Sequence, residues 1–173
     1  KMNINENIEN IVAPKYQLKL FGYEKYFNTF IKMADKNVLP NTILLSGPKG
    51  LGKSTFVYHF VNYLLSKNEK NKYTLENFSI NPDNKSYKNI CNFTHPNFFL
   101  VERKDSDDNI KIESIRETLK FLKKSTFSSD IKIVIIDDVE SLNVNSSNAL
   151  LKSLEEPNKN TFFFLIHDST KNI

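Results

Sequence analysis

Residues 46–55, which read SGPKGLGKST, constrain this chain more than any other stretch, because they hold three of its four glycines. From Gly47 to Ser54 the stretch fits the pattern G-x-x-x-x-G-K-[ST] at every position. A loop that wraps a polyphosphate must turn several N–H groups inward, which requires positive φ angles and leaves no room for side chains. A helix beginning near Lys53 would add its positive N-terminal end, and Lys53 would reach the β- and γ-phosphates. The stretch therefore predicts a nucleotide-phosphate site made of Gly47, Pro48, Lys49, Gly50, Leu51, Gly52, Lys53, Ser54 and Thr55.

The segments around this loop predict alternating strands and helices. Apolar runs predict buried strands at 42–46, 97–102, 131–137 and 161–166. Apolar residues at helical spacing predict helices over about 24–37, 53–65, 112–124 and 145–156, the last capped by Asn145 or Ser146 and stopped by Pro157. The polar segment 66–97 is either irregular or a short helical excursion. We therefore expect an α/β fold with a parallel sheet and helices on both faces.

A magnesium ion bound beside the phosphates would need a carboxylate at the end of a neighbouring strand. The run IVIID supplies Asp137 in that place, and Ser54 would be the second metal ligand. Asp138 stands where many ATP hydrolases carry a glutamate that positions water, but its side chain is one methylene shorter. It can equally begin the next turn, so both interpretations of Asp138 stay open.

Composition limits the remaining possibilities. The net charge is +4, but only two of the 24 basic residues are arginines, so the charge favours a DNA-binding surface on this chain only weakly. Cys91 is the single cysteine and excludes an internal disulfide. The longest apolar run, 162–166, is too short to cross a membrane, and the polar start does not resemble a signal peptide. We expect a cytoplasmic protein without a membrane partner.

Several classes of phosphate-loop protein fit poorly. Small GTPases need an N-K-x-D motif, which residues 158–161 do not supply, and a glycine-containing switch, whereas no glycine follows Gly52. Kinases of small molecules usually clamp the transferred phosphate with arginines in a lid, but Arg103 and Arg116 both precede the strand that ends at Asp137. The glycine-rich signature of ABC-type ATPases is absent.

The remaining blocks carry a resemblance to one family. They are LFGYE (20–24), LPNTILLSGPKGLGKST (39–55), HPNFFLVE (95–102), IESIRETLKFL (112–122), IKIVIIDDVESLN (131–143) and SSNALLKSLEEPNKNTFFFLI (146–166). In this order they resemble the bacterial clamp-loader AAA+ subunits of the DNA polymerase III holoenzyme, and within that family the δ′ subunits most. The block SNALLKSLEEP is the most specific of them.

The resemblance implies a fold, cofactors and partners. It implies a RecA-like P-loop NTPase domain of three α/β/α layers that binds ATP with Mg²⁺. The implied partners are the δ and γ/τ subunits and, indirectly, the β sliding clamp and primed DNA. The family's adenine site falls near Phe21 and Gly22, although these residues can also simply lead into a helix. The family's γ-phosphate sensor falls on His167, which can also be just a polar residue at a strand end.

Departures from the family pattern matter equally. Motor subunits carry a four-cysteine zinc module, whereas this chain offers only Cys91 and His95 there, so we expect no zinc. The arginine finger, the helical lid and the C-terminal collar of the family would all lie beyond Ile173. We therefore expect 1–173 to be a single AAA+ nucleotide-binding subdomain, with an N-terminal arm (1–19) and a polar insertion (66–97).

Three functions remain open on these observations. The leading hypothesis is a δ′-like clamp-loader subunit that binds ATP and turns it over weakly or not at all. An active γ/τ-like ATPase motor is the second, and the shorter Asp138 and the missing zinc cysteines count against it. A scaffold with a vestigial phosphate loop is the third, and the intact Lys53 and Ser54 count against that.

Overall fold

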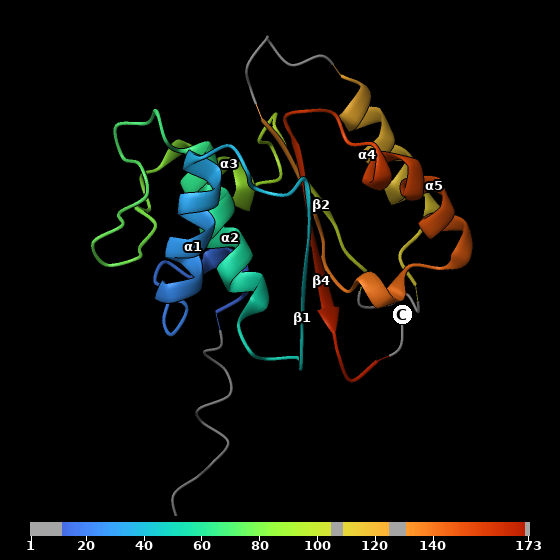
Figure 1. Ribbon diagram of the computed structural model, residues 1–173, viewed down its shortest axis with the longest axis horizontal. Helices are drawn as coiled ribbons and strands as arrows, with labels where there is room; N and C mark the ends of the chain where they lie inside the picture. Colours follow the sequence, from blue (N-terminus) through green and yellow to red (C-terminus); the bar gives the residue numbers. More distant parts are fainter. Residues whose placement is uncertain (1–11, 105–108, 125–130, 172–173) are drawn as a thin grey trace, which may run out of the picture.

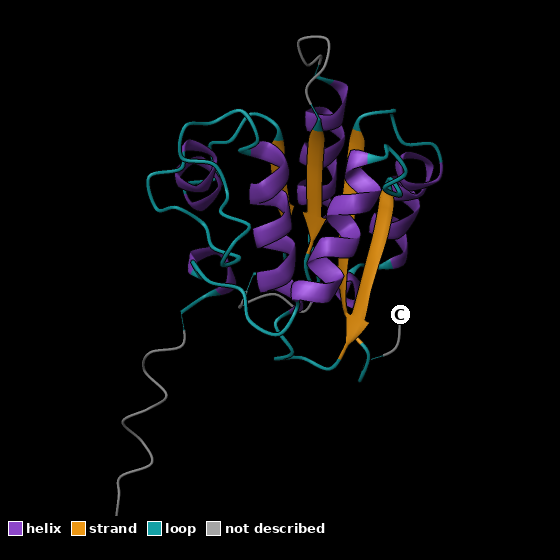
Figure 2. Ribbon diagram, turned by 60° about the vertical axis from the view of Figure 1, so that its left-hand side comes forward, coloured by secondary structure: helices purple, strands orange, loops and turns teal. Residues whose placement is uncertain are grey.

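The computed structural model describes residues 12–104, 109–124 and 131–171. Four strands form one sheet in the order β1-β4-β3-β2, and every neighbouring pair is parallel. The strands are β1 (Thr42–Gly47), β2 (Phe98–Val101), β3 (Lys132–Ile136) and β4 (Thr161–Asp168). Because parallel strands begin and end at the same edges, the loops after all four strands meet at one edge of the sheet (Figure 2).

Helices cover both faces of this sheet. On one side lie α1 (Glu24–Asp35), α2 (Lys53–Leu65) and α3 (Lys85–Cys91), and on the other lie α4 (Ile112–Lys123) and α5 (Val144–Glu155) (Figure 1). Two short 3₁₀ turns complete the order, η2 (Pro14–Tyr16) and η3 (Val139–Ser141). The predicted parallel sheet with helices on both faces is confirmed.

The core consists of two apolar clusters separated by the sheet. On the α1–α2 side, Phe27 packs edge-on against Phe56 and Phe60, with ring centroids 5.8 and 5.6 Å apart. On the α4–α5 side, Ile115 and Leu150 are fully buried in the second cluster. All five residues of β3 are buried, as expected of a central strand whose side chains alternate between two covered faces.

The ends of the last helix correct one prediction. Asn143 caps α5, since its side chain accepts a hydrogen bond from the N–H of Ser146 at 2.9 Å. The expected caps, Asn145 and Ser146, lie inside the helix, so that prediction was wrong. The reason is that Asn143 already satisfies the first-turn donors, which lets the helix begin at Val144. The helix ends before Pro157, as predicted.

The polar segment 66–97 contains the helical excursion, α3. Asn84 caps this helix, and the Glu69 carboxylate accepts hydrogen bonds from the N–H groups of Lys85 and Ser86 at 2.7 and 3.0 Å. Ser86 also contacts His95 at 3.2 Å. Hydrogen bonds made by polar side chains therefore stabilise the segment 66–97, which has little apolar periodicity.

The described part of the N-terminal arm lies against this insertion rather than apart from it. The N–H of Ile80 donates to the carbonyl of Leu18 at 2.9 Å, and the N–H of Leu20 donates to that of Phe78 at 3.0 Å. The buried ring of His59 contacts the carbonyl of Gln17 at 3.0 Å. Residues 1–11 of the predicted arm lie outside the described residues.

Candidate nucleotide-binding site

The glycine-rich loop connects β1 to α2 at the edge of the sheet where all four strands end. Gly50 and Gly52 have φ angles of +89° and +79°, which residues with side chains rarely adopt. Gly52 is the N-cap of α2, so the first turn of that helix faces the loop. The conformation predicted for a phosphate-binding loop is present.

A cavity of about 850 Å³ lies over this loop. Its lining combines the loop, the start of α1 and the ends of β2, β3 and β4. Of the predicted site residues it includes Phe21, Lys49, Gly50, Leu51, Gly52, Lys53, Ser54, Thr55, Asp137 and Asp138. Gly47, Pro48, Gly22 and His167 are not among its lining residues.

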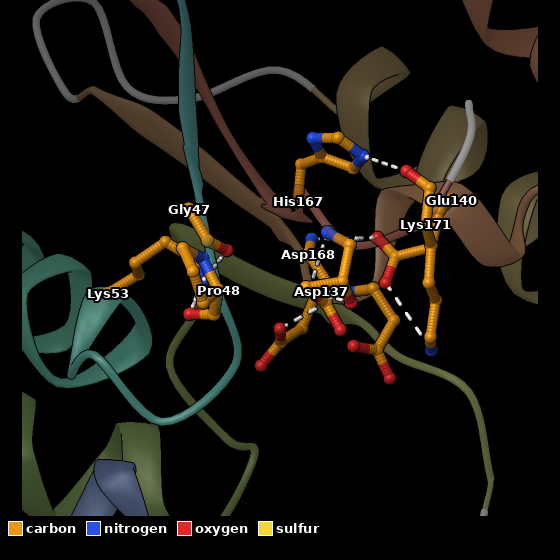
Figure 3. A network of polar contacts seen from close by, with 10 residues as sticks. Gly47, Pro48, Lys53, Asp137, Glu140, His167, Asp168 and Lys171 are labelled. Atoms are coloured by element: carbon orange, nitrogen blue, oxygen red, sulfur yellow. Dashed lines mark hydrogen bonds and ion pairs between the residues drawn. The ribbon is translucent and has the colours of Figure 1, made fainter.

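Lys53 lies folded over the beginning of the loop. Its Nζ donates hydrogen bonds to the carbonyl oxygens of Gly47 at 2.6 Å and Pro48 at 2.7 Å (Figure 3). Gly47 and Pro48 therefore belong to the site through Lys53. Lys53 also lines the cavity, so its ammonium group adds a positive charge there.

Ser54 and Asp137 meet although they are 83 positions apart in the chain. The Ser54 hydroxyl donates to Asp137 Oδ2 at 3.2 Å. Burial, together with the negative charge of Asp138, raises the pKa of Asp137 to about 6 against the opposing hydrogen bond from Ser54. The Ser54 hydroxyl and the Asp137 carboxylate offer the oxygen ligands that Mg²⁺ prefers, and a cation there would offset the negative charge that burial disfavours. These two residues fit the metal that the sequence implies, and the loop fits the phosphates.

Asp138 begins the next turn, as one of the two interpretations left open by the sequence has it, and its role in positioning water stays a prediction. It lines the cavity, and it also precedes η3, with its carbonyl accepting from the N–H of Ser141 at 2.8 Å. Its backbone is left-handed, with φ of +57°, and its N–H donates to Asp137 Oδ1 at 3.0 Å. A non-glycine residue in this region costs about 1 kcal/mol or more. The residue is held next to Asp137 at an energetic cost.

His167 points to neighbours other than the cavity. Its Nδ1 lies 2.9 Å from Ser46 Oγ on β1, and its Nε2 lies 3.1 Å from the carbonyl oxygen of Lys171 (Figure 3). The next residue, Asp168, does line the cavity. The sensor role of His167 stays a prediction.

Sequence reasoning missed a second carboxylate at the end of β4. Asp168 Oδ1 accepts hydrogen bonds from the N–H and hydroxyl of Thr170 at 3.1 and 2.8 Å, and these bonds lower the pKa of Asp168, helped by the positive charges of Lys171 and Lys53. The nearly buried Glu140 accepts from the Asp168 N–H at 3.3 Å and pairs with Lys171 at 3.6 Å. The rule that polar residues gather after parallel strands could have suggested Asp168.

The region implied for a base lies at the start of α1. Phe21 is 74% exposed and lines the cavity, and Gly22 has a φ of +78° that allows the chain to turn into the helix. Tyr23 lines the same wall. An exposed aromatic ring beside a phosphate loop can stack on a base. Phe21 lines the cavity and Gly22 leads into the helix, and the role of these two residues in binding a base stays a prediction.

Two further searches were restricted to the residues that the structure describes. None of the helices found there is long and apolar enough to cross a membrane. The same residues contain no group of three or more His, Cys, Asp or Glu side chains placed to hold a metal ion. Cys91 Sγ contacts the carbonyl of Lys15 at 3.5 Å, whereas His95 contacts Ser86, so these two residues serve different neighbours.

Known proteins match this fold and this loop. The family described as "DNA polymerase III, delta subunit" matches residues 22–173. The DNA polymerase III subunit delta' of Pseudomonas aeruginosa is 31% identical over 123 residues, which are 71% of this chain and 36% of that protein. The DNA polymerase III subunit gamma of Buchnera aphidicola subsp. Acyrthosiphon pisum is 29% identical over 153 residues, covering 88% of this chain and 40% of the relative.

A solved structure agrees with the fold. The crystal structure of a DNA polymerase III gamma subunit-related protein from Thermotoga maritima superposes with a TM-score of 0.55 at 21% identity, covering 82% of this chain and 38% of that one. This likeness supports the predicted three-layer α/β fold. The chain spans 36–40% of the length of these three proteins.

Proposed function

This chain belongs to the family described as DNA polymerase III, delta subunit, and from that premise we propose that it is the nucleotide-binding part of a δ′-like clamp-loader subunit. In this role it binds Mg·ATP and takes part in placing the β sliding clamp on primed DNA. Its proposed partners are the δ and γ/τ subunits of the same assembly. The names of the similar proteins support the assembly, and the phosphate loop supports the nucleotide.

The observation that carries the nucleotide proposal is the meeting of Ser54 and Asp137 under the loop. A glycine turn that merely linked a strand to a helix would not need a half-buried carboxylate from a different strand beside it. The carboxylate has a raised pKa and therefore favours a neighbouring cation. The two oxygens and the loop N–H groups are the complementary parts of a site for a magnesium–polyphosphate.

Each residue has a distinct role in this proposal. The loop N–H groups from Gly50 to Ser54 would surround the β-phosphate, and Lys53 would exchange its bonds to the loop carbonyls for bonds to phosphate oxygens. Ser54 and Asp137 would hold Mg²⁺, which when bound neutralises charge on the phosphates. Phe21 would stack on the base.

Turnover of the nucleotide is proposed to be slow. Asp138 is too short to hold an attacking water where a glutamate would, and a displacement of about 1 Å costs roughly 10²-fold in rate. An active γ/τ-like motor is the second candidate, and the similarity to proteins named gamma favours it. A steady-state phosphate-release assay separates the two, because a motor would show turnover that Lys53→Ala abolishes.

Calorimetry with Mg·ATP tests nucleotide binding directly. We expect the wild type to bind and Lys53→Ala to bind at least about tenfold more weakly, because it loses charge-assisted hydrogen bonds to phosphate. Lys25→Ala is the matched control, since Lys25 is an exposed lysine that does not line the cavity. Equal affinity of the wild type and Lys53→Ala would refute the phosphate-loop assignment.

A further inference from the structure

Tyr23 connects the base-side wall of the cavity to the phosphate loop. It is the N-cap residue of α1, and its hydroxyl donates a hydrogen bond to the carbonyl oxygen of Leu51 in the loop. Its ring packs against Phe56 of α2, with centroids 5.4 Å apart. Figure 1 shows α1 and α2 side by side, so the contact bridges the first turns of two neighbouring helices.

The same ring also lies over the glycine that follows. A Cβ placed on Gly52 would lie 3.5 Å from Tyr23 Cε2, which is ordinary van der Waals contact. Tyr23 therefore bonds to the Leu51–Gly52 peptide through its hydroxyl, and its ring occupies the side of Gly52 on which a Cβ would stand.

The geometry of a peptide unit gives these contacts a consequence for the loop. A trans peptide is planar, and its C=O and N–H bonds point to opposite sides. A hydrogen bond that fixes the carbonyl of Leu51 therefore also fixes the direction of the N–H of Gly52, away from Tyr23. This N–H is one of the loop donors that a phosphate would use.

We propose that Tyr23 is a positioning residue of the nucleotide site, because its hydroxyl sets the Leu51–Gly52 peptide so that the Gly52 N–H donates to bound phosphate. This inference rests on the proposed binding of Mg·ATP. The hydroxyl does not touch the phosphate; it keeps the donor oriented before the ligand arrives. Its contribution to affinity is the reorientation that the loop avoids on binding.

The sequence provides a direct observation of this one peptide. Leu51–Gly52 is the only leucine–glycine pair in the chain. Leucine is labelled with ¹³C at the carbonyl and glycine with ¹⁵N. An NMR spectrum that correlates each amide N–H with the preceding carbonyl carbon then shows a single cross-peak, which reports the Leu51 carbonyl and the Gly52 N–H. Its position depends on the hydrogen bond that the carbonyl accepts.

The test compares Tyr23→Phe with Tyr26→Phe in the 173-residue chain. Tyr26 is 63% exposed and lies on the same helix, so its variant is a matched control. We expect Tyr23→Phe to move the Leu51–Gly52 peak in the nucleotide-free protein and to weaken Mg·ATP binding about fivefold, the worth of one hydrogen bond. Tyr26→Phe should do neither. An unmoved peak, or a moved peak with unchanged affinity, overturns the proposal.

Magnesium tripolyphosphate separates action through the loop from contact with the base. If Tyr23 orients the loop, its loss weakens tripolyphosphate by the same factor as ATP. If ATP alone weakens, Tyr23 contacts the base and the proposal is wrong. Failure of the wild type to bind Mg·ATP, or equal binding by Lys53→Ala, refutes the nucleotide site itself, whereas binding that is lost in Lys53→Ala but kept in Tyr23→Phe refutes only the role of Tyr23.

Discussion

Replacing Asp137 by asparagine is expected to stabilise the nucleotide-free protein at neutral pH. The two side chains have nearly the same shape: the amide oxygen of asparagine can accept from the Asp138 N–H in place of Oδ1, and its Nδ2 can donate to the Ser54 oxygen in place of Oδ2, because a hydroxyl both donates and accepts. The variant removes only the negative charge, which burial and the charge of Asp138 disfavour. A residue proposed to hold Mg²⁺ would thus be a source of instability in the empty protein.

The magnitude follows from the pKa of Asp137, which rises from 3.8 to about 6 on folding. Each pKa unit corresponds to about 1.4 kcal/mol. At pH 7.5 the folded state must keep the carboxylate ionised, which costs about 3 kcal/mol relative to the unfolded chain. Below pH 3.8 the carboxyl is protonated in both states and the cost disappears; it grows as the pH rises through about 6. The gain from Asp137→Asn should therefore be about 3 kcal/mol at pH 7.5 and about 1 kcal/mol at pH 4.5.

Urea unfolding followed by circular dichroism at pH 7.5 and pH 4.5, in EDTA, measures this difference. Asp83→Asn is the control, because Asp83 has a side chain that is 74% exposed and pairs with Lys88 at the surface at 3.0 Å. Its replacement should change the free energy of unfolding by about 0.5 kcal/mol or less at either pH. The same substitution chemistry is then compared at a half-buried and an exposed position.

Two results would refute the reasoning. A loss of stability in Asp137→Asn at pH 7.5 would mean that the carboxylate is stabilised by its surroundings. A gain of the same size at both pH values would mean that packing, not charge, causes the effect. Saturating Mg·ATP should reverse the order of the two proteins, because it stabilises the wild type by mass action and binds Asp137→Asn weakly.

Three further predictions concern other groups. Burial lowers the pKa of His59 to about 4, so at mildly acidic pH the unfolded chain takes up a proton that the folded chain excludes. In the Asp137→Asn background, lowering the pH from 6.5 to 5 should therefore reduce the free energy of urea unfolding by about 2 kcal/mol, and His59→Gln should remove this dependence on pH. Lys132, whose Nζ donates to three carbonyls at the C-terminus of α4, should cost about 2–3 kcal/mol when replaced by methionine, measured by the same unfolding assay. Phosphate release should stay near background and rise only slightly in Asp138→Glu; turnover near one per second (about the low end for enzymes) that Lys53→Ala abolishes would contradict the proposed slow site.

The strands could be predicted because each is a short, mostly apolar run, and most helices because their apolar residues recur every three to four positions. Residues 133–136 form an unbroken apolar run, and β3 is accordingly buried on both faces. The start of α5 was misplaced because Asn143, Asn145 and Ser146 can all act as caps, and only the packing of the helix decides among them. The form of 66–97 could not be chosen from the sequence, since long-range polar contacts such as Glu69 to Ser86 hold it.

The phosphate loop and Asp137 were predictable because their chemistry demands fixed residue types at fixed spacing. Asp168 could have been suggested by its place at the end of a parallel strand, whereas Tyr23 could not, because its role depends on a meeting between distant segments. The contact of Tyr23 with Leu51 joins residues 28 positions apart, and the sequence around neither residue predicts it. The role of His167 as a sensor stays a prediction, and the residue after it, Asp168, lines the cavity.

The costs concentrated at the end of β3 bear on whether the loop could be vestigial. Folding raises the pKa of Asp137, so keeping this side chain ionised at neutral pH costs stability, and Asp138 holds a left-handed backbone that a glycine would adopt more easily. Asparagine at 137 and glycine at 138 would each relieve one of these costs while leaving β3 intact. A scaffold that no longer bound nucleotide would gain stability from either replacement and lose nothing. Residues that lower the stability of the folded chain are expected where function requires them. Asp137 and Asp138 are such residues, and their position beneath the phosphate loop argues for a site that binds a magnesium–nucleotide.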